Sequence, residues 1–385
     1  VDGYTTLGSL PYSQRTSLTE ATEDAINPTG TTQQMLTEQV GYIRNSVKAV
    51  VDAYDGSVEL YEFDEQDPVL KAWKGVFPGT VKPKSEISDE LRDHLRYPED
   101  LFKVQRSLIT KYHVNDPRQF FTNDAFWSVP GDPTVENENR QSLNQPPYYI
   151  VAADPETKKP SFQLITPFRG LKREFLAAHM SVSSDPDNYG KITVRVLPTD
   201  TQTQGPKQAQ DTMMSSDQVA RDRSLWKGTN DLKNGNLLTL PVGGGQILYV
   251  EPIYSQRRDQ TSAFPKLLRV LVSYNGKVGY APTIAEALSQ VGIDPREASD
   301  VEDAVAAGAD TTANKGDDAQ GNNNDTQQPA SAPAASSEGE ALDRVNKALD
   351  GLQEAKGKSF EEYGKAIDEL DRAVDEYRKI KDGGG

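Results

Sequence analysis

The chain of 385 residues contains no cysteine and only three histidines. The absence of cysteine excludes disulfides, thiolate metal sites and cysteine nucleophiles, and it fits either the cytosol or an exported domain. The longest apolar stretch, residues 237–250, is interrupted by Pro241 and by Gly243-Gly244-Gly245. A membrane-spanning helix needs about 20 consecutive apolar residues, so no transmembrane segment is predicted within this sequence.

Basic residues are also scarce relative to acidic ones, and the net charge is -16. Residues 294–340 carry 11 acidic and 2 basic residues, whereas the 293 residues before them are only mildly acidic. Neither region offers the basic stripe that binding to a phosphate backbone requires. Nucleic acid is therefore not expected among the partners.

Composition divides the chain into three regions. Residues 1–293 hold most of the apolar residues and are predicted to form the globular body, as one or two subdomains. Residues 294–340 contain no aromatic residue and are dominated by small and polar ones, which predicts a disordered, flexible acidic linker. Over residues 341–382 apolar side chains recur at helical spacing in two stretches that meet at Gly357. This pattern predicts a C-terminal α-helical hairpin that needs a partner surface.

The body mixes helical and strand patterns, which predicts an α+β fold with helices concentrated early and strands later. Apolar residues at positions 47, 50, 51 and 54 predict a helix from about Arg44 to the Asp55-Gly56 turn. Asp67-Pro68 reads as the N-cap and first-turn proline of another helix, and Asn275-Gly276 as a hairpin turn. Further helices are predicted at 88–96, 98–112 and 283–291, and strands at 57–63, 148–152, 162–166, 176–182, 192–197, 246–252 and 268–274.

Five blocks of sequence follow one another in the body: YIRNSVKAVVDAYDGSVELY at 42–61, HLRYPEDLFKVQ at 94–105, YHVNDPRQFF at 112–121, GPKQAQ at 205–210 and GNLLTLPVGGGQILYVEPIY at 235–254. Together they make the chain similar to the uncharacterised protein family 0182, large membrane proteins of actinobacteria and some other bacteria. The resemblance covers about residues 1–293. It implies several transmembrane helices before Val1 and a place for this domain on the extracytoplasmic side of the plasma membrane. It implies no active site, because the family has no established catalytic residues.

Histidines and acids near the fourth predicted helix could form a metal site: His94, His113, Asp93, Glu99, Asp100 and Asp116. Zinc ligands usually come in close pairs, and this spacing provides none. We therefore predict structural histidines bonded to carboxylates or to the backbone, and no metal or cofactor. His179, in a predicted strand, is expected to be half buried. A serine hydrolase is not expected, since no G-x-S-x-G motif occurs.

Two further groups have a structural and a functional interpretation. Asp64, Glu65 and Asp67 lie on a turn where two carboxylates could serve acid–base chemistry, but a turn with an N-cap is the simpler interpretation. Aromatic residues at 112–127, with Tyr148 and Tyr149, could line a groove for glycan or lipid. A packing cluster is favoured over a groove, with the phenylalanines at 120, 121 and 126 in the core.

The candidate ligand-binding residues are Gly243, Gly244, Gly245 and Glu251. The glycines lie between two apolar runs and could present backbone N–H groups to an anion or a lipid phosphate. A hairpin turn or bulge is the alternative, because no P-loop lysine follows. Glu251, in the strand that follows, would place a carboxylate near the loop.

The sequence thus predicts a domain without evident catalysis that binds a ligand or a protein in cell-envelope assembly or transport. Its expected partners are the membrane through N-terminal helices, an envelope lipid or glycan, and a protein or second copy through the hairpin. One alternative is a cell-surface enzyme or chaperone, which metal dependence would distinguish. An architectural module that self-associates through the hairpin is the other.

Overall fold

The structure is a computed structural model of the chain. It describes residues 1–25, 39–135, 143–153, 158–198, 202–226, 230–257 and 264–294, together with the helical positions Arg344, Lys347, Ala348, Arg372 and Ala373. Two compact units are distinguished, Val1–Asn314 and Lys315–Gly385. Apart from Asp294 and those five positions, the predicted acidic linker and helical hairpin lie outside the described residues.

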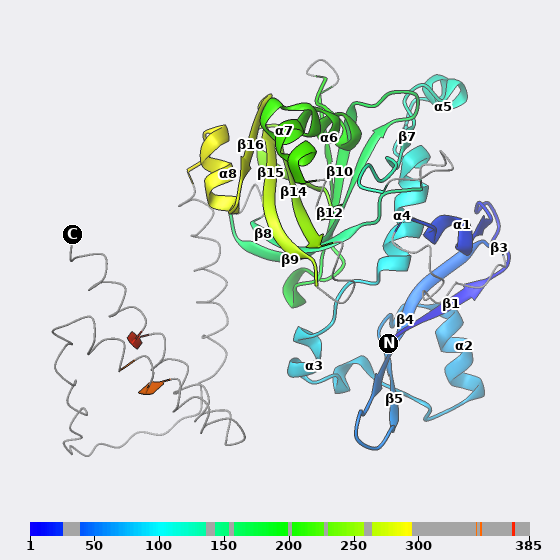
Figure 1. Ribbon diagram of the computed structural model, residues 1–385. Helices are drawn as coiled ribbons and strands as arrows, with labels where there is room; N and C mark the ends of the chain where they lie inside the picture. Colours follow the sequence, from blue (N-terminus) through cyan, green and yellow to red (C-terminus); the bar gives the residue numbers. More distant parts are fainter. Residues whose placement is uncertain are drawn as a thin grey trace, which may run out of the picture. The chain divides into compact units, whose positions relative to one another are not determined.

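The first unit has the predicted α+β fold and is built on three larger sheets (Figure 1). The described strands are β1 (Asp2–Leu7), β2 (Thr16–Ser17), β3 (Gln39–Val40), β4 (Tyr42–Val51), β5 (Val58–Glu62), β6 (Val81–Lys82), β7 (Trp127–Ser128), β8 (Tyr148–Ala153), β9 (Pro160–Gly170), β10 (Leu176–Ser183), β11 (Ile192–Val196), β12 (Asn230–Asn234), β13 (Leu238–Gly243), β14 (Gln246–Arg257), β15 (Lys266–Tyr274) and β16 (Lys277–Ala281). The described helices are α1 (Leu18–Thr22), α2 (Pro68–Val76), α3 (Asp89–Asp93), α4 (Glu99–Tyr112), α5 (Pro117–Thr122), α6 (Pro206–Ser215), α7 (Asp217–Trp226) and α8 (Ile284–Val291), with 3₁₀ turns η1 (Lys84–Glu86) and η2 (Pro186–Asn188). No helix in the described part of the chain is both long and apolar enough to cross a membrane.

The first sheet has the order β1-β4-β5-β6 and contains the main error of the sequence prediction. The segment from Arg44, predicted as a helix, is the central strand β4, which pairs antiparallel with β1 and β5. Its buried positions include Ser46 and Lys48, which are polar. Both have partners distant in sequence, because Ser46 donates to Asp67 and Lys48 pairs with Asp2. The spacing of the apolar residues therefore indicated the period of a helix, which this segment does not form. Its β-branched valines favoured a strand.

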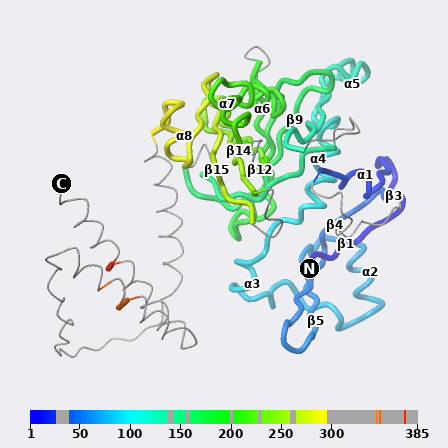
Figure 2. Tube along the Cα trace, in the orientation of Figure 1, coloured from blue at the N-terminus to red at the C-terminus, as the bar shows by residue number. Residues whose placement is uncertain are grey.

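The second sheet has the order β11-β10-β9, with β8 and β7 both pairing with β9. Helix α4 covers one face of it, where Phe102 packs with Phe168 and Met180 in a hydrophobic cluster. Along the chain, η1, α3 and α4 link the first sheet to the second (Figure 2). His179, expected to be half buried, is 2% exposed and faces Leu240 and Pro241 of the third sheet across a small cavity. This prediction was wrong because the third sheet covers this part of strand β10.

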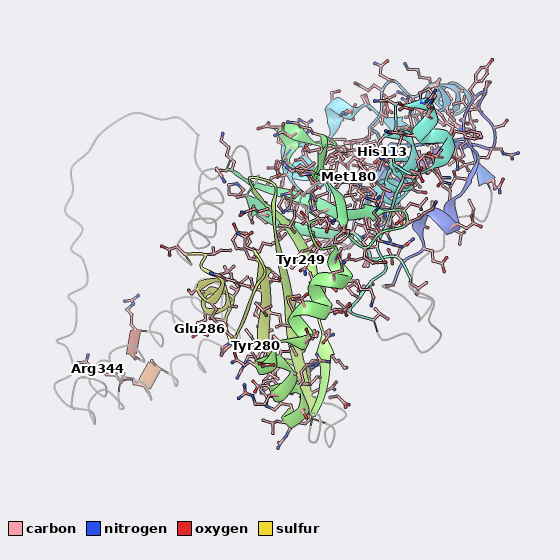
Figure 3. The ribbon with its side chains drawn as sticks, turned by 90° about the horizontal axis from the view of Figure 1, so that it is seen from above. His113, Met180, Tyr249, Tyr280, Glu286 and Arg344 are labelled. Carbon is pink, nitrogen blue, oxygen red and sulfur yellow. The ribbon has the colours of Figure 1, made fainter. Side chains whose placement is uncertain are left out.

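The third sheet runs β12-β14-β15-β16, with β13 also pairing with β14. Alternate residues of β14 enter different clusters: Tyr249 lies with Met213 of α6, whereas Val250 lies with Leu288 of α8. The sheet is therefore covered by α6 and α7 on one face and by α8 on the other. Met180 and Tyr249 mark the buried cores of the second and third sheets (Figure 3).

Local signals predicted several element ends correctly. Asp67 caps α2, and the helix predicted at 283–291 is α8, which ends at Gly292 with a positive φ of 90°. Asn275 and Gly276, with φ of 49° and 73°, join β15 to β16. The predicted concentration of helices early and strands late holds only in part: α1 to α5 precede β7 to β16, but β1, β4 and β5 also lie early, and α6 and α7 follow the second sheet.

Candidate functional site

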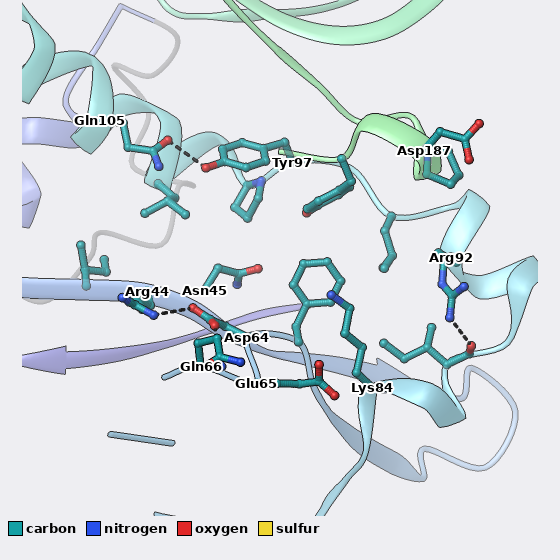
Figure 4. Close-up of a pocket in the computed structure, with 18 residues that line it drawn as sticks. Arg44, Asn45, Asp64, Glu65, Gln66, Lys84, Arg92, Tyr97, Gln105 and Asp187 are labelled. Atoms are coloured by element: carbon teal, nitrogen blue, oxygen red, sulfur yellow. Dashed lines mark hydrogen bonds and ion pairs between the residues drawn. The ribbon is translucent and has the colours of Figure 1, made fainter. Parts of the chain in front are cut away.

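A cavity of about 710 Å³ opens beside the first sheet, between that sheet and the turn η2 of the second (Figure 4). A volume of this size is typical of small-molecule sites. Its walls are formed by Ile43, Arg44, Asn45, Phe63, Asp64, Glu65, Gln66, Lys84, Ile87, Arg92, Leu95, Tyr97, Pro98, Leu101, Gln105, Pro186, Asp187 and Tyr189. They come from β4, the segment after β5, the region from η1 to α4, and η2.

Asp67 fixes the segment after β5 that forms one wall of the cavity. Its side chain is buried, and it accepts five hydrogen bonds: from the N–H groups of Val69 and Leu70 and from the hydroxyls of Tyr42, Thr5 and Ser46. Burial opposes ionisation of Asp67, but these hydrogen bonds outweigh it and lower the pKa to about 2. The carboxylate thus ties α2 to both β1 and β4.

Three aromatic rings form the inner wall. Phe63 meets Tyr189 edge to face, with ring centroids 5.1 Å apart, and Tyr189 lies 5.8 Å from Tyr97. The ammonium groups of Lys48 and Lys84 each lie 4.7 Å from the Phe63 centroid. Cations at this distance are attracted by the ring quadrupole. The wall therefore presents an apolar surface with two lysine ammonium groups beside it.

Hydrogen bonds hold these rings in place. Lys48 is buried, forms an ion pair with Asp2 and donates to the Tyr189 hydroxyl at 3.0 Å. The Tyr189 hydroxyl donates to the carbonyl of Arg96, and the Tyr97 hydroxyl donates to Gln105 at 2.9 Å. Burial lowers the pKa of Lys48, and its bond to Asp2 opposes that shift. The first and second sheets thus share the aromatic wall.

The charged residues of the cavity fall into two groups. Arg44 pairs with Asp64 at 3.0 Å, and Arg92 pairs with Asp89 at 3.3 Å. Within the described part of the chain, Glu65, Asp187 and Lys84 make no ion pair. The cavity therefore offers one cation and two carboxylates that a ligand can pair with, beside an aromatic wall.

The structure separates the three acids considered for acid–base chemistry. Asp64 and Glu65 line the cavity, whereas Asp67 is buried beneath it as the helix cap. The interpretation of this segment as a turn with an N-cap is confirmed. Sequence analysis missed Lys84, Tyr97 and Tyr189, which approach the acids only through the packing of the two sheets.

The glycine segment forms the predicted hairpin turn between β13 and β14. Gly243, Gly244 and Gly245 have φ of 94°, 60° and 75°, and Gly244 and Gly245 line a second cavity of about 540 Å³. Glu251 is not beside this turn. It lies six residues beyond Gly245, about 20 Å away at the usual rise per residue, and is fully buried.

Glu251 is a core carboxyl. One oxygen accepts a hydrogen bond from Gln210 of α6 at 3.1 Å, and the other has no partner among the described residues. Burial raises the pKa of Glu251 to about 7, and the bond from Gln210 opposes this shift. The structure thus brings the three glycines together and leaves Glu251 apart from them.

The histidines near α4 are bonded to the backbone, as predicted. The Nδ1 atom of His94 lies 2.7 Å from the carbonyl oxygen of Glu90. Both ring nitrogens of His113 lie beside carbonyl oxygens, at 2.7 Å from Ile109 and 3.0 Å from Ala125. No group of three or more potential metal ligands occurs within the described ranges.

The aromatic stretch at 112–127 is divided between core and surface. Trp127 is buried and stacks on the His113 ring, with centroids 3.5 Å apart. Phe120 and Phe121, both predicted to be in the core, are 39% and 91% exposed, and Tyr112 is 53% exposed. The prediction for Phe120 and Phe121 was wrong because α5 contributes no buried residue.

Comparison with known proteins identifies the family. The model of the Uncharacterised protein family (UPF0182) matches residues 1–226. A UPF0182 protein of Corynebacterium glutamicum strain R is 78% identical over 303 residues, which cover 79% of this chain and 31% of that protein. The chain belongs to the UPF0182 family.

Other UPF0182 proteins match in the same way. That of Corynebacterium diphtheriae is 71% identical over 350 residues, covering 90% of this chain and 35% of the relative. That of Nocardia farcinica is 59% identical over 298 residues, covering 76% and 30%. The chain spans about a third of the length of these relatives, and no solved structure matches it.

Proposed function

We propose that this chain is an extracytoplasmic binding domain of a multi-pass membrane protein, and that the cavity beside the first sheet holds an amphiphilic ligand of the cell envelope. In this proposal the membrane helices belong to the part of the UPF0182 length that the chain does not span. The family resemblance supports the location. The cavity supports binding rather than catalysis, since its residues form a recognition surface without an evident nucleophile and base.

The observation that best supports this proposal is a set of charged side chains that make no ion pair and surround an aromatic wall. Lys84 can pair with a negative group, while Glu65 and Asp187 can pair with a positive one. The rings of Phe63 and Tyr189 can cover an apolar part of the ligand. A zwitterionic head attached to an alkyl chain satisfies all three features.

Four probes with the same alkyl chain test this proposal: dodecylphosphocholine, dodecyl phosphate, dodecyltrimethylammonium and tetraethylene glycol dodecyl ether. Calorimetric titration below their critical micelle concentrations measures each affinity. We expect the zwitterionic probe to bind most tightly, because only it pairs with charges of both signs.

Substitutions in the cavity identify the groups that recognise the head. We expect Lys84→Gln to weaken dodecylphosphocholine binding about tenfold, the loss of one charge-assisted contact at a partly exposed site. Lys82→Gln is the matched control, since Lys82 pairs with Glu59 and does not line the cavity. Equal affinity for all four probes, or equal loss in both variants, would reject the proposal.

A further inference from the structure

The second cavity, of about 540 Å³, lies where two hairpin turns of the third sheet meet. Gly243-Gly244-Gly245 joins β13 to β14, and Asn275-Gly276 joins β15 to β16. Because Tyr249 of β14 pairs with Ser273 of β15, both turns fall at the same end of the sheet. The segment around Gln204, which precedes α6, closes the third side.

Hydrogen bonds between the walls keep this cavity formed. The Tyr249 hydroxyl donates to the carbonyl of Gln204 at 2.5 Å, which fixes the third side to the sheet. The Tyr274 hydroxyl donates to the side-chain oxygen of Gln246, which links the two turns. Neither bond uses the amide NH₂ of Gln246, which remains available as a donor.

The lining mixes polar and apolar groups and carries no charge. None of the twelve lining residues is acidic or basic, although the chain has a net charge of -16. Polar side chains that both donate and accept hydrogen bonds lie at the accessible part of the lining: Thr203, Gln204, Gln246 and Asn275. The half-buried ring of Tyr274 supplies apolar surface, whereas Tyr249 is 3% exposed and its ring packs into the core.

Backbone conformation, not lack of space, explains the glycines of the turn. A Cβ atom built on Gly244 or Gly245 would meet nothing within 4 Å, so these residues are required by their positive φ and not by crowding. Their backbone is exposed at the rim, where its N–H and C=O groups can also contact a ligand.

We propose that this cavity is a binding site for a neutral carbohydrate. A charged phosphate or carboxylate would find no cationic side chain in the lining, and an alkyl chain would bury polar groups without partners. An extended peptide usually adds to the edge of a sheet, whereas this cavity lies at the ends of strands. A sugar presents hydroxyls that donate and accept, together with an apolar face that can lie on a tyrosine ring.

The test uses the whole chain and a set of small probes: maltose, lactose and cellobiose as neutral sugars, inorganic phosphate as an anion, and capped tetra-alanine as a neutral peptide. Two-dimensional NMR titration of ¹⁵N-labelled protein reports both affinity and location. We expect saturable shifts from at least one disaccharide at the amides of Gly244, Gly245 and Gly276.

Variants locate the contacts. We expect Gln246→Leu to weaken disaccharide binding at least about fivefold, through the loss of hydrogen bonds. Thr203→Val removes one hydroxyl at nearly constant volume and should weaken binding without affecting folding. Gln218→Leu, on an exposed position of α7, is the control and should bind as the wild type does.

Three results would overturn the proposal: no disaccharide binding, unchanged binding in both cavity variants, or preferential binding of phosphate or tetra-alanine at these amides. The outcome is independent of the proposed function, because the two cavities share no lining residue.

Discussion

Replacing Glu251 with glutamine should make the protein more stable at high pH and not at low pH. The carboxyl group is fully buried, and burial raises its pKa from 4.5 to about 7. The folded state therefore binds this proton more tightly than the unfolded state does. The stability that the group contributes is fully present below pH 4.5 and is lost as the pH rises through 7.

The size of the effect follows from the shift. About 2.5 pKa units correspond to roughly 3 kcal/mol between the protonated and ionised forms. Glutamine keeps the shape and the oxygen that accepts from Gln210, but it has no charge to bury. The difference in unfolding free energy between Glu251→Gln and the wild type should therefore move by about 3 kcal/mol in favour of the variant between pH 4.5 and pH 8.

Urea denaturation of both proteins at the two pH values measures this change, and every other titrating group cancels in the difference. Glu286→Gln serves as the control, since Glu286 is exposed on α8 (Figure 3) and its difference should stay nearly constant. If the Glu251→Gln difference also stayed constant across this range, the carboxyl would not be buried as the structure places it.

Two further substitutions test the local anchors of the fold. Asp67→Ala removes a helix cap and leaves two buried hydroxyls without their acceptor, so it should cost about 3 kcal/mol at pH 7 by urea denaturation. Because the pKa of Asp67 is about 2, below 3.8 in the unfolded state, this cost should shrink as the pH falls from 3.8 toward 2; a cost independent of pH would contradict the hydrogen-bond network. Gly276→Ala places a side chain at φ 73° and should cost about 1 kcal/mol, whereas Gly75→Ala, inside α2, should be neutral or stabilising.

Elements with a local signature could be predicted from the sequence, because a cap or a turn involves neighbours in the chain. Asp67-Pro68 begins a helix and Asn275-Gly276 forms a turn through contacts with neighbouring residues of the chain. Strand β4 could not be predicted in this way, since its buried Ser46 and Lys48 depend on residues of β1 and of the α2 cap. Helix α6 did carry a local signal in Gly205-Pro206 followed by Gln208, whose side-chain oxygen accepts a hydrogen bond from the Gly205 N–H.

The candidate site was only partly visible in the sequence. Glu65 was noted as one of three neighbouring acids, but its role depends on Lys84 and Asp187, which come from other elements. The glycine turn was predicted, yet the uncharged character of its cavity depends on Gln204 and Asn275, which packing brings beside it. Sites assembled from distant segments leave no contiguous motif.

The most direct test of ligand binding beside the first sheet is a crystal structure of the domain with dodecylphosphocholine. We expect the phosphate beside Lys84, the trimethylammonium group beside Glu65 or Asp187, and the alkyl chain against Phe63 and Tyr189. A fully occupied ligand bound elsewhere, with this cavity filled by solvent, would contradict the proposed function.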